Sequence, residues 1–180
     1  TTLTIMQALY APLYSFNNGN IEWGLAESLE PSADNLSYIL KLKPNLTWQD
    51  GQPITADDVV FTFDKLLDEK QHSFFRSMFM YGGKPVQVSK VDDLTVKFTL
   101  PQVSAAFVGT LVQIYPIPQH VFANENDLEK SGRNDAPVGS GPFKFKEYRA
   151  GQYYALTRFD GYWNGKPKLD SVTRSEEHTS

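Results

Sequence analysis

Residues 37–67 constrain the fold more than any other part of the sequence, because three local signals follow one another within them. Residues 37–43 alternate between apolar and polar side chains, which predicts a half-buried strand that ends at Pro44. An Asp-Gly dipeptide at residues 50–51 predicts a turn. From Thr55 onward, apolar residues recur at helical spacing, which predicts a helix with one buried face.

Four aspartates, at positions 50, 57, 58 and 64, lie in this stretch and raise the question of a metal or acid–base site. Asp57 and Asp58 fit the first turn of a helix capped by Thr55, where the helix dipole favours acidic side chains. As successive helical residues they point about 100° apart, so they do not converge on one ligand. We therefore predict that the aspartates support the turn and the helix. A hydrolase built on Asp50, Asp57 and Asp58 is the alternative.

Other residues with chemical potential lack the spacing that a site requires. His72 and His120 are far apart in the sequence and show no metal-ligand spacing. The chain contains no cysteine, which excludes disulfides and cysteine-ligated metals. Ser140 lies between two glycines, but a nucleophile elbow needs glycine two places earlier, where Val138 stands. We predict a tight backbone turn there, and no catalytic residue, metal site or cofactor.

Shorter patterns predict the remaining elements. Strict alternation at 94–100, after the similar stretch 86–90, predicts a hairpin. Because hairpins occur beside helices, we expect an α/β fold, with a mixed sheet and flanking helices. The polar, glycine- and proline-rich residues 124–142 predict a linker. Further expected elements are helices at 3–13 and 104–112, a turn at 17–20, and strands at 143–149 and 152–159 joined at Ala150-Gly151.

Composition limits the class of protein. With 180 residues, the chain is long enough for one domain with a substantial core. The formal net charge of −4 argues against nucleic acid as the main partner, since phosphate contacts need a basic surface. No apolar run approaches the roughly 18 residues that a membrane-spanning helix needs.

Four stretches, in this order and spacing, carry a resemblance to a known family: residues 24–67, 88–100, 137–163 and 165–172. The most specific string is NLTWQDGQPITADDVVFTFDKLL, which begins at Asn45. Together the stretches resemble the bacterial extracellular solute-binding proteins of family 5, which serve peptide and nickel ABC transporters. The resemblance covers about residues 6–173. Leu29, Asn35 and Ser140 stand where the family often has Trp, Gly and Thr.

The resemblance implies the fold of a type II periplasmic binding protein, in which two lobes close on a solute. Members of the family are much longer than this chain, so we expect it to supply part of the first lobe, with the second lobe absent. The resemblance also implies a division of the chain. Residues 1–9 are the end of the entry segment of the main lobe, residues 10–135 form a small subdomain, and residues 136–173 return to the main sheet. The heptapeptide 174–180 resembles a translated sequencing adapter, and we expect it to be foreign to the protein.

The resemblance also carries over to a few ligand contacts. Residues 73–82 align with a segment of the peptide-binding branch in which an aromatic residue faces the ligand, and that position is Phe75. Phe74, Arg76 and Tyr81 are further candidates, and Arg76 is suited to pair with a ligand carboxylate. The alternative is that the aromatic residues among them belong to the core.

The function that the resemblance implies is that of a non-enzymatic receptor, the substrate-binding component of an ABC transporter that imports peptides. Such a receptor binds a small peptide or other polar solute between its lobes and delivers it to the permease subunits. It lies in the periplasm or on the extracellular face of the cell envelope, and meets the membrane only through the permease or a lipid anchor. Receptors for nickel, oligosaccharides or other solutes are the alternatives within the family.

Overall fold

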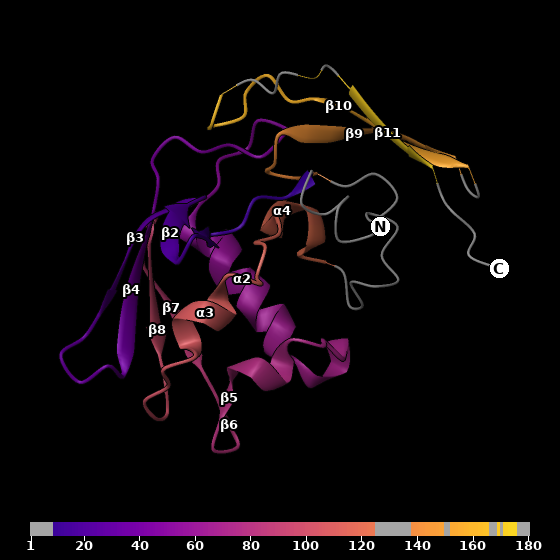
Figure 1. Ribbon diagram of the computed structural model, residues 1–180. Coiled ribbons are helices and arrows are strands. Elements are labelled where there is room, and N and C mark those ends of the chain that lie inside the picture. Colours follow the sequence, from indigo (N-terminus) through magenta and orange to yellow (C-terminus); the bar gives the residue numbers. More distant parts are fainter. Residues whose placement is uncertain (1–8, 125–137, 150–151, 166–168, 170, 176–180) are drawn as a thin grey trace.

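A four-stranded antiparallel sheet with helices packed on one face forms the larger part of the structure (Figure 1). The computed structural model describes residues 9–124, 138–149, 152–165, 169 and 171–175. In spatial order, the strands are β3 (Ala26–Pro31), β4 (Ser37–Leu42), β8 (Thr95–Thr99) and β7 (Gln87–Asp92). The two central strands, β4 and β8, therefore come from distant parts of the sequence.

The alternation predicted for the central strands places one face of this sheet in the core. Tyr38 on β4 and Phe98 on β8 are direct cross-strand partners, and both are buried. Lys41 and Lys97, which point to the other face, are exposed. The predicted strand at 37–43 is confirmed, and so is the predicted hairpin, because β7 pairs antiparallel with β8.

Helix α2 (Ala56–Leu67) packs on the buried face of the sheet. Its Phe63 meets Phe98 edge to face, with the ring centroids 5.2 Å apart. Full burial of a side chain of this kind stabilises the fold by about 1.5–3 kcal/mol. Thr55 and Asp58 form a capping box, in which the Asp58 carboxylate accepts the backbone N–H of Thr55 at 3.0 Å. The predicted helix start is confirmed.

Shorter elements complete the helical layer. Helix α3 (Phe107–Leu111) places Phe107 against Tyr38 and Phe98, with ring centroids 4.8 and 5.5 Å away. The helix predicted at 104–112 is thus present but shorter. Other short elements near α2 and α3 in the sequence are α4 (Gln119–Phe122), the 3-10 helices η1 (Glu69–Gln71) and η2 (Arg76–Phe79), and the strands β5 (Met80–Tyr81) and β6 (Lys84–Pro85).

A hairpin precedes the sheet. Strand β1 (Tyr14–Asn17) pairs with β2 (Asn20–Trp23) across Asn18 and Gly19, whose φ angles are 51° and 81°. Two successive residues of positive φ form a type I′ turn, whose twist matches that of paired strands, and glycine adopts such a φ without strain. The turn predicted at 17–20 is confirmed.

The helix predicted at 3–13 ends earlier than expected. Residues 1–8 lie outside the described residues, Leu9 is helical, and residues 10–13 are not helical. The carbonyl of Pro12 accepts the N–H of Leu25, and the carbonyl of Leu13 accepts the N–H of Gly24. Tertiary hydrogen bonds therefore hold this backbone extended, although its apolar spacing suits a helix.

A separate three-stranded antiparallel sheet lies at the top of the view in Figure 1. It consists of β9 (Phe143–Arg149), β10 (Tyr153–Arg158) and β11 (Ser171–Ser175), with β10 in the centre. The two strands predicted from residue 143 onward are confirmed, although the joining residues 150–151 lie outside the described part. Strand β11 includes Arg174 and Ser175, so the final heptapeptide begins within a strand; its foreign origin stays a prediction, and residues 176–180 lie outside the described part.

The division into a small subdomain and a return to the main sheet also stays a prediction. Its boundary, between 135 and 136, falls in residues 125–137, which lie outside the described part together with most of the predicted linker. The first described residues beyond them, from 138 onward, lead into β9.

All strand pairs in the described part are antiparallel, which corrects the expectation of a mixed sheet there. Strand β8 reaches β4 as the second arm of the β7–β8 hairpin, and that arm runs opposite to β4. The combination of helices and strands itself is as predicted. None of the described helices combines the length and the apolar character that crossing a bilayer requires.

Candidate functional site

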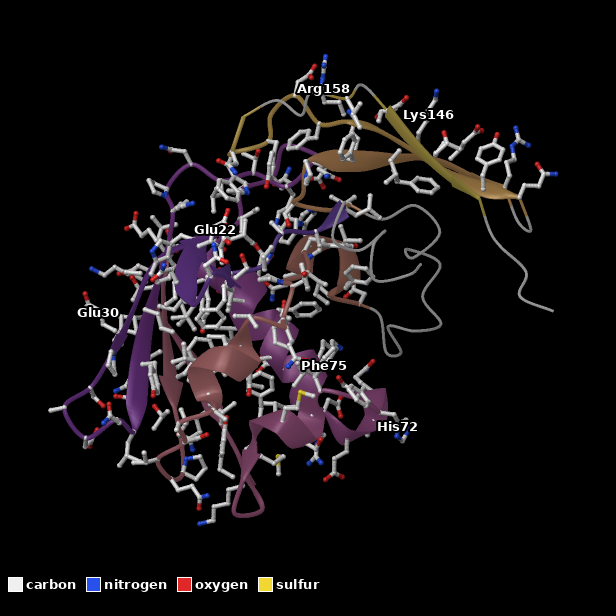
Figure 2. All side chains as sticks on the ribbon, in the orientation of Figure 1. Glu22, Glu30, His72, Phe75, Lys146 and Arg158 are labelled. Carbon is white, nitrogen blue, oxygen red and sulfur yellow. The ribbon has the colours of Figure 1, made fainter. Side chains whose placement is uncertain are left out.

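The segment predicted to contain the solute contacts, residues 73–82, runs through η2 and β5. Phe74 is 78% exposed, whereas Phe75 is partly buried against the core. The two rings meet edge to face, with centroids 5.6 Å apart. Figure 2 shows Phe75 on the side of the helices that is remote from the three-stranded sheet. The ring of Phe74 is thus open to solvent, whereas the ring of Phe75 contacts both Phe74 and the core.

The guanidinium of Arg76 is engaged within the protein. Its Nε donates to the carbonyl of Leu67 at 3.1 Å, and Nη2 lies 3.1 Å from Glu69 Oε1. The Glu69 carboxylate is largely exposed, so a carboxylate of a solute would compete with a well-solvated partner. Arg76 therefore joins the end of α2 to η1 and η2.

Tyr81, the fourth candidate, lies in the core. It is 8% exposed, and burial raises the pKa of Tyr81 while the nearby Ser104 hydroxyl opposes the shift. Its hydroxyl makes no well-formed hydrogen bond to any residue that the structure describes. The alternative of a core role thus fits Tyr81 better than it fits Phe74.

Asp58 is the most buried of the four aspartates, at 5% exposure, and its carboxylate accepts three hydrogen bonds. The donors are the Trp48 indole Nε1 at 3.1 Å, the Thr55 backbone at 3.0 Å and the Gln119 backbone at 2.9 Å. The first two lie in the β4–α2 loop, residues 43–55, and the third begins α4. Asp58 therefore joins the loop, α2 and α4.

The other aspartates have different partners. Asp50 lies 2.6 Å from His120 Nε2, and Asp57 lies 3.1 Å from Lys90 Nζ. Burial raises the pKa of Asp64, and neighbouring Lys65 opposes that shift. Within the described residues, no group of three or more His, Asp or Glu side chains is placed to bind a metal. The three carboxylates of Asp50, Asp57 and Asp58 thus have different partners, as the scaffold interpretation predicts.

A junction that the sequence did not reveal surrounds Gln49. Its Nε2 donates to the carbonyls of Gly141 at 3.0 Å and Phe143 at 2.7 Å, with Leu9 O at 3.5 Å. Its Oε1 accepts the N–H of Gly139 at 3.0 Å, and its own N–H donates to the Gly139 carbonyl at 3.0 Å. The Gln49 side chain thus contacts the backbone of Leu9, earlier in the chain, and of residues 139–143, much later in the chain.

The residues around Ser140 complete this junction. The Leu9 carbonyl accepts the N–H groups of Ser140 at 2.8 Å and Gly141 at 2.7 Å, and Ser140 Oγ accepts the Ala11 N–H at 2.8 Å. Ser140 is 1% exposed, so its hydroxyl is not available as a nucleophile. A Cβ on Gly139 would lie 1.9 Å from the Leu9 carbonyl oxygen, which explains the glycine. The predicted backbone role of this motif fits these contacts.

A second contact joins the same loop to the residues after β10. Lys43 Nζ lies 4.0 Å from the ring centroid of Trp163 and 3.4 Å from the Trp23 carbonyl oxygen. Burial lowers the pKa of Lys43, and the Glu27 carboxylate opposes that shift. The β4–α2 loop therefore contacts the chain both before β9 and after β10.

The family of this chain follows from its match to a family model. The model of bacterial extracellular solute-binding proteins, family 5, matches residues 20–175. The chain belongs to this family. The match includes the β4–α2 loop, the aromatic segment and all three strands of the three-stranded sheet.

Solved structures resemble this family 5 chain closely. The ABC transporter substrate-binding protein CtaP from Listeria monocytogenes is 55% identical, with a TM-score of 0.91 over 96% of this chain and 35% of its own. The oligopeptide-binding protein AppA from Bacillus subtilis, solved with a nonapeptide, is 34% identical, with a TM-score of 0.89 over 97% of this chain and 35% of its own. NikZ from Campylobacter jejuni, solved with Ni(L-His), is 27% identical, with a TM-score of 0.83 over 93% of this chain and 33% of its own.

Curated relatives also match most of this chain. AppA from Bacillus subtilis is 38% identical over 170 residues, which cover 89% of this chain and 31% of the relative. The chain thus spans about a third of the length of the proteins it matches. The α/β fold expected from the resemblance, part of a type II periplasmic binding protein, is confirmed.

Proposed function

We propose that the full-length protein is the substrate-binding component of an ABC transporter that imports peptides. The observation that carries the proposal is the close likeness to AppA, whose structure holds a nonapeptide, over nearly the whole chain. The protein binds the solute reversibly, without chemical change, and delivers it to permease subunits of the membrane. It acts in the periplasm or on the extracellular face of the cell envelope.

Within the described residues, we propose the surface around Phe74 as this chain's contribution to solute binding. Phe74 is open to solvent, Phe75 contacts it edge to face, and Arg76, two residues further along the chain, carries a positive charge. An aromatic contact of this kind adds about 0.5–1.5 kcal/mol beyond area burial. That is small beside the roughly 8 kcal/mol of micromolar affinity, so most contacts come from elsewhere in the full-length protein.

Calorimetry of the full-length protein tests the function. Titration with a library of peptides of two to nine residues is expected to give saturable binding, and Ni(L-His) is expected to give none. Mass spectrometry of the mixture after incubation should recover the peptide intact. Binding of Ni(L-His) alone would move the protein to the nickel branch, and cleavage of the peptide would contradict a non-enzymatic receptor.

A further inference from the structure

The β4–α2 loop holds the three-stranded sheet at two separated points. Gln49 binds residues 139–143, which lead into β9, and Lys43 contacts Trp163, which follows β10. A body attached at one point can rotate about it in any direction, whereas a second attachment leaves only rotation about the line that joins the two points. The two sheets of the structure are thus restrained against rotation relative to each other.

The chemistry at the first point requires an amide. The Gln49 Nε2 donates toward three carbonyl oxygens, and its Oε1 accepts one N–H. A carboxylate of the same length has no donor and would face those carbonyl oxygens, while alanine would leave them and the Gly139 N–H without the side-chain partner.

We propose that Gln49 is a positioning residue that fixes the three-stranded sheet onto the four-stranded sheet, so that both move as one body. The fixation rests on the contacts of Gln49 and Lys43, and it does not depend on the proposed function.

Gln52 provides a matched control on the same loop. Its side chain is exposed, and the hydrogen bonds of this residue within the loop use its backbone: its N–H donates to Asp50 Oδ1, and its carbonyl accepts the Trp48 N–H. The variants Gln49→Ala and Gln49→Glu are therefore compared with Gln52→Ala and Gln52→Glu. Each control replaces the same residue type and makes the same change in net charge.

Distances between two spin labels measure the fixation in the full-length protein. The labels are attached through Glu30→Cys on β3 and Lys146→Cys on β9, two exposed positions that Figure 2 shows far apart, one on each sheet. This chain has no cysteine of its own. We expect a narrow distance distribution in the parent and in both Gln52 variants, and one at least twice as broad in both Gln49 variants. Parental widths in the Gln49 variants would overturn the proposal.

Hydrogen exchange tests the junction in the unsubstituted protein, and therefore does not depend on whether a variant folds. The amides of Ala11, Gly139, Ser140 and Gly141 should exchange within tenfold of the slowest amides of β4 and β8. Exchange more than a hundredfold faster would mean that the junction opens on its own, which would also overturn the proposal.

Addition of the nonapeptide separates the two conclusions. A label distance that stays constant while calorimetry records binding supports two sheets that move as one body, and a shift upon binding contradicts it. Absence of binding counts against the proposed function, whereas the comparison of Gln49 with Gln52 variants still decides the fixation.

Discussion

The indole N–H of Trp48 donates to the carboxylate of Asp58 at 3.1 Å, and the two side chains are 0% and 5% exposed. This contact fixes the loop that follows β4 to the first turn of α2. The same carboxylate accepts the Gln119 N–H, and so it also fixes the start of α4. Asp58 is therefore a structural acceptor within the motif that identifies the family.

Replacement of Asp58 by alanine is expected to lower the free energy of unfolding by about 3–5 kcal/mol, since several buried donors lose a charged acceptor at once. Asp58→Asn, which keeps one acceptor oxygen, should lose less. Chemical denaturation monitored by Trp fluorescence measures both. The control is Asp57→Ala, whose half-exposed carboxylate pairs with Lys90 and which should have a much smaller effect. Equal losses at 57 and 58 would contradict the structural role of Asp58.

Gly139→Ala is expected to destabilise the protein by about 3 kcal/mol or more, because the new Cβ overlaps the Leu9 carbonyl and backbone must move. Gly109→Ala is the matched control, since no atom lies within 4 Å of its added Cβ and the residue is helical. That change should stabilise by about 0.5–1 kcal/mol. Thermal unfolding of both variants checks the pair, and a tolerated alanine at 139 would show that the junction is not closely packed.

Phe74→Ala is expected to weaken peptide binding about three- to tenfold and to leave stability nearly unchanged, because the ring is exposed. Phe75→Ala should instead lower stability, since this ring packs against the core. Calorimetry and thermal unfolding of the full-length protein separate the two effects. Val103→Ala, at another exposed apolar position, should change neither quantity. Unchanged affinity after loss of Phe74 would remove this surface from the solute site.

Alkaline pH should destabilise the fold through Tyr10. Burial raises the pKa of Tyr10 to about 12 from its ordinary value of 10.0. The folded state holds the phenolic proton more tightly than the unfolded state, so this stabilisation is complete below pH 10 and is lost as pH rises toward 12. The loss amounts to roughly 2–3 kcal/mol. Unfolding free energies measured between pH 8 and 12 should fall less steeply for Tyr10→Phe, and identical slopes would contradict the assignment.

Local patterns predicted those parts of the fold in which neighbouring residues decide the conformation. The alternation through Tyr38 and Leu40, and the capping of α2 by Thr55, are signals of this kind. Residues 10–13 have helical spacing, yet their carbonyls bind the chain around Leu25, and nothing local announces that partner. Tertiary hydrogen bonds decided the outcome there.

The same distinction applies to the candidate site. The resemblance located the aromatic segment, but sequence alone could not decide which of Phe74 and Phe75 faces solvent, since the segment has neither strand nor helix periodicity before η2. Gln49 gave no signal, because its side-chain partners from Gly139 to Phe143 are about ninety residues away along the chain. A polar residue in a turn is ordinarily solvated, and only the folded structure reveals the partners of Gln49.

The hydrogen bond from the Ala11 N–H to Ser140 Oγ spans 129 positions of the chain, and it implies an order of assembly. During synthesis Ala11 emerges long before Ser140, so its N–H must wait without its final partner while the four-stranded sheet and its helices form. Closing such a large loop is slow, because its entropy must be lost before the contacts compensate it. The unpaired backbone near Ala11 is meanwhile open to other strands, so this stage is the one at which a chaperone would best protect the nascent chain.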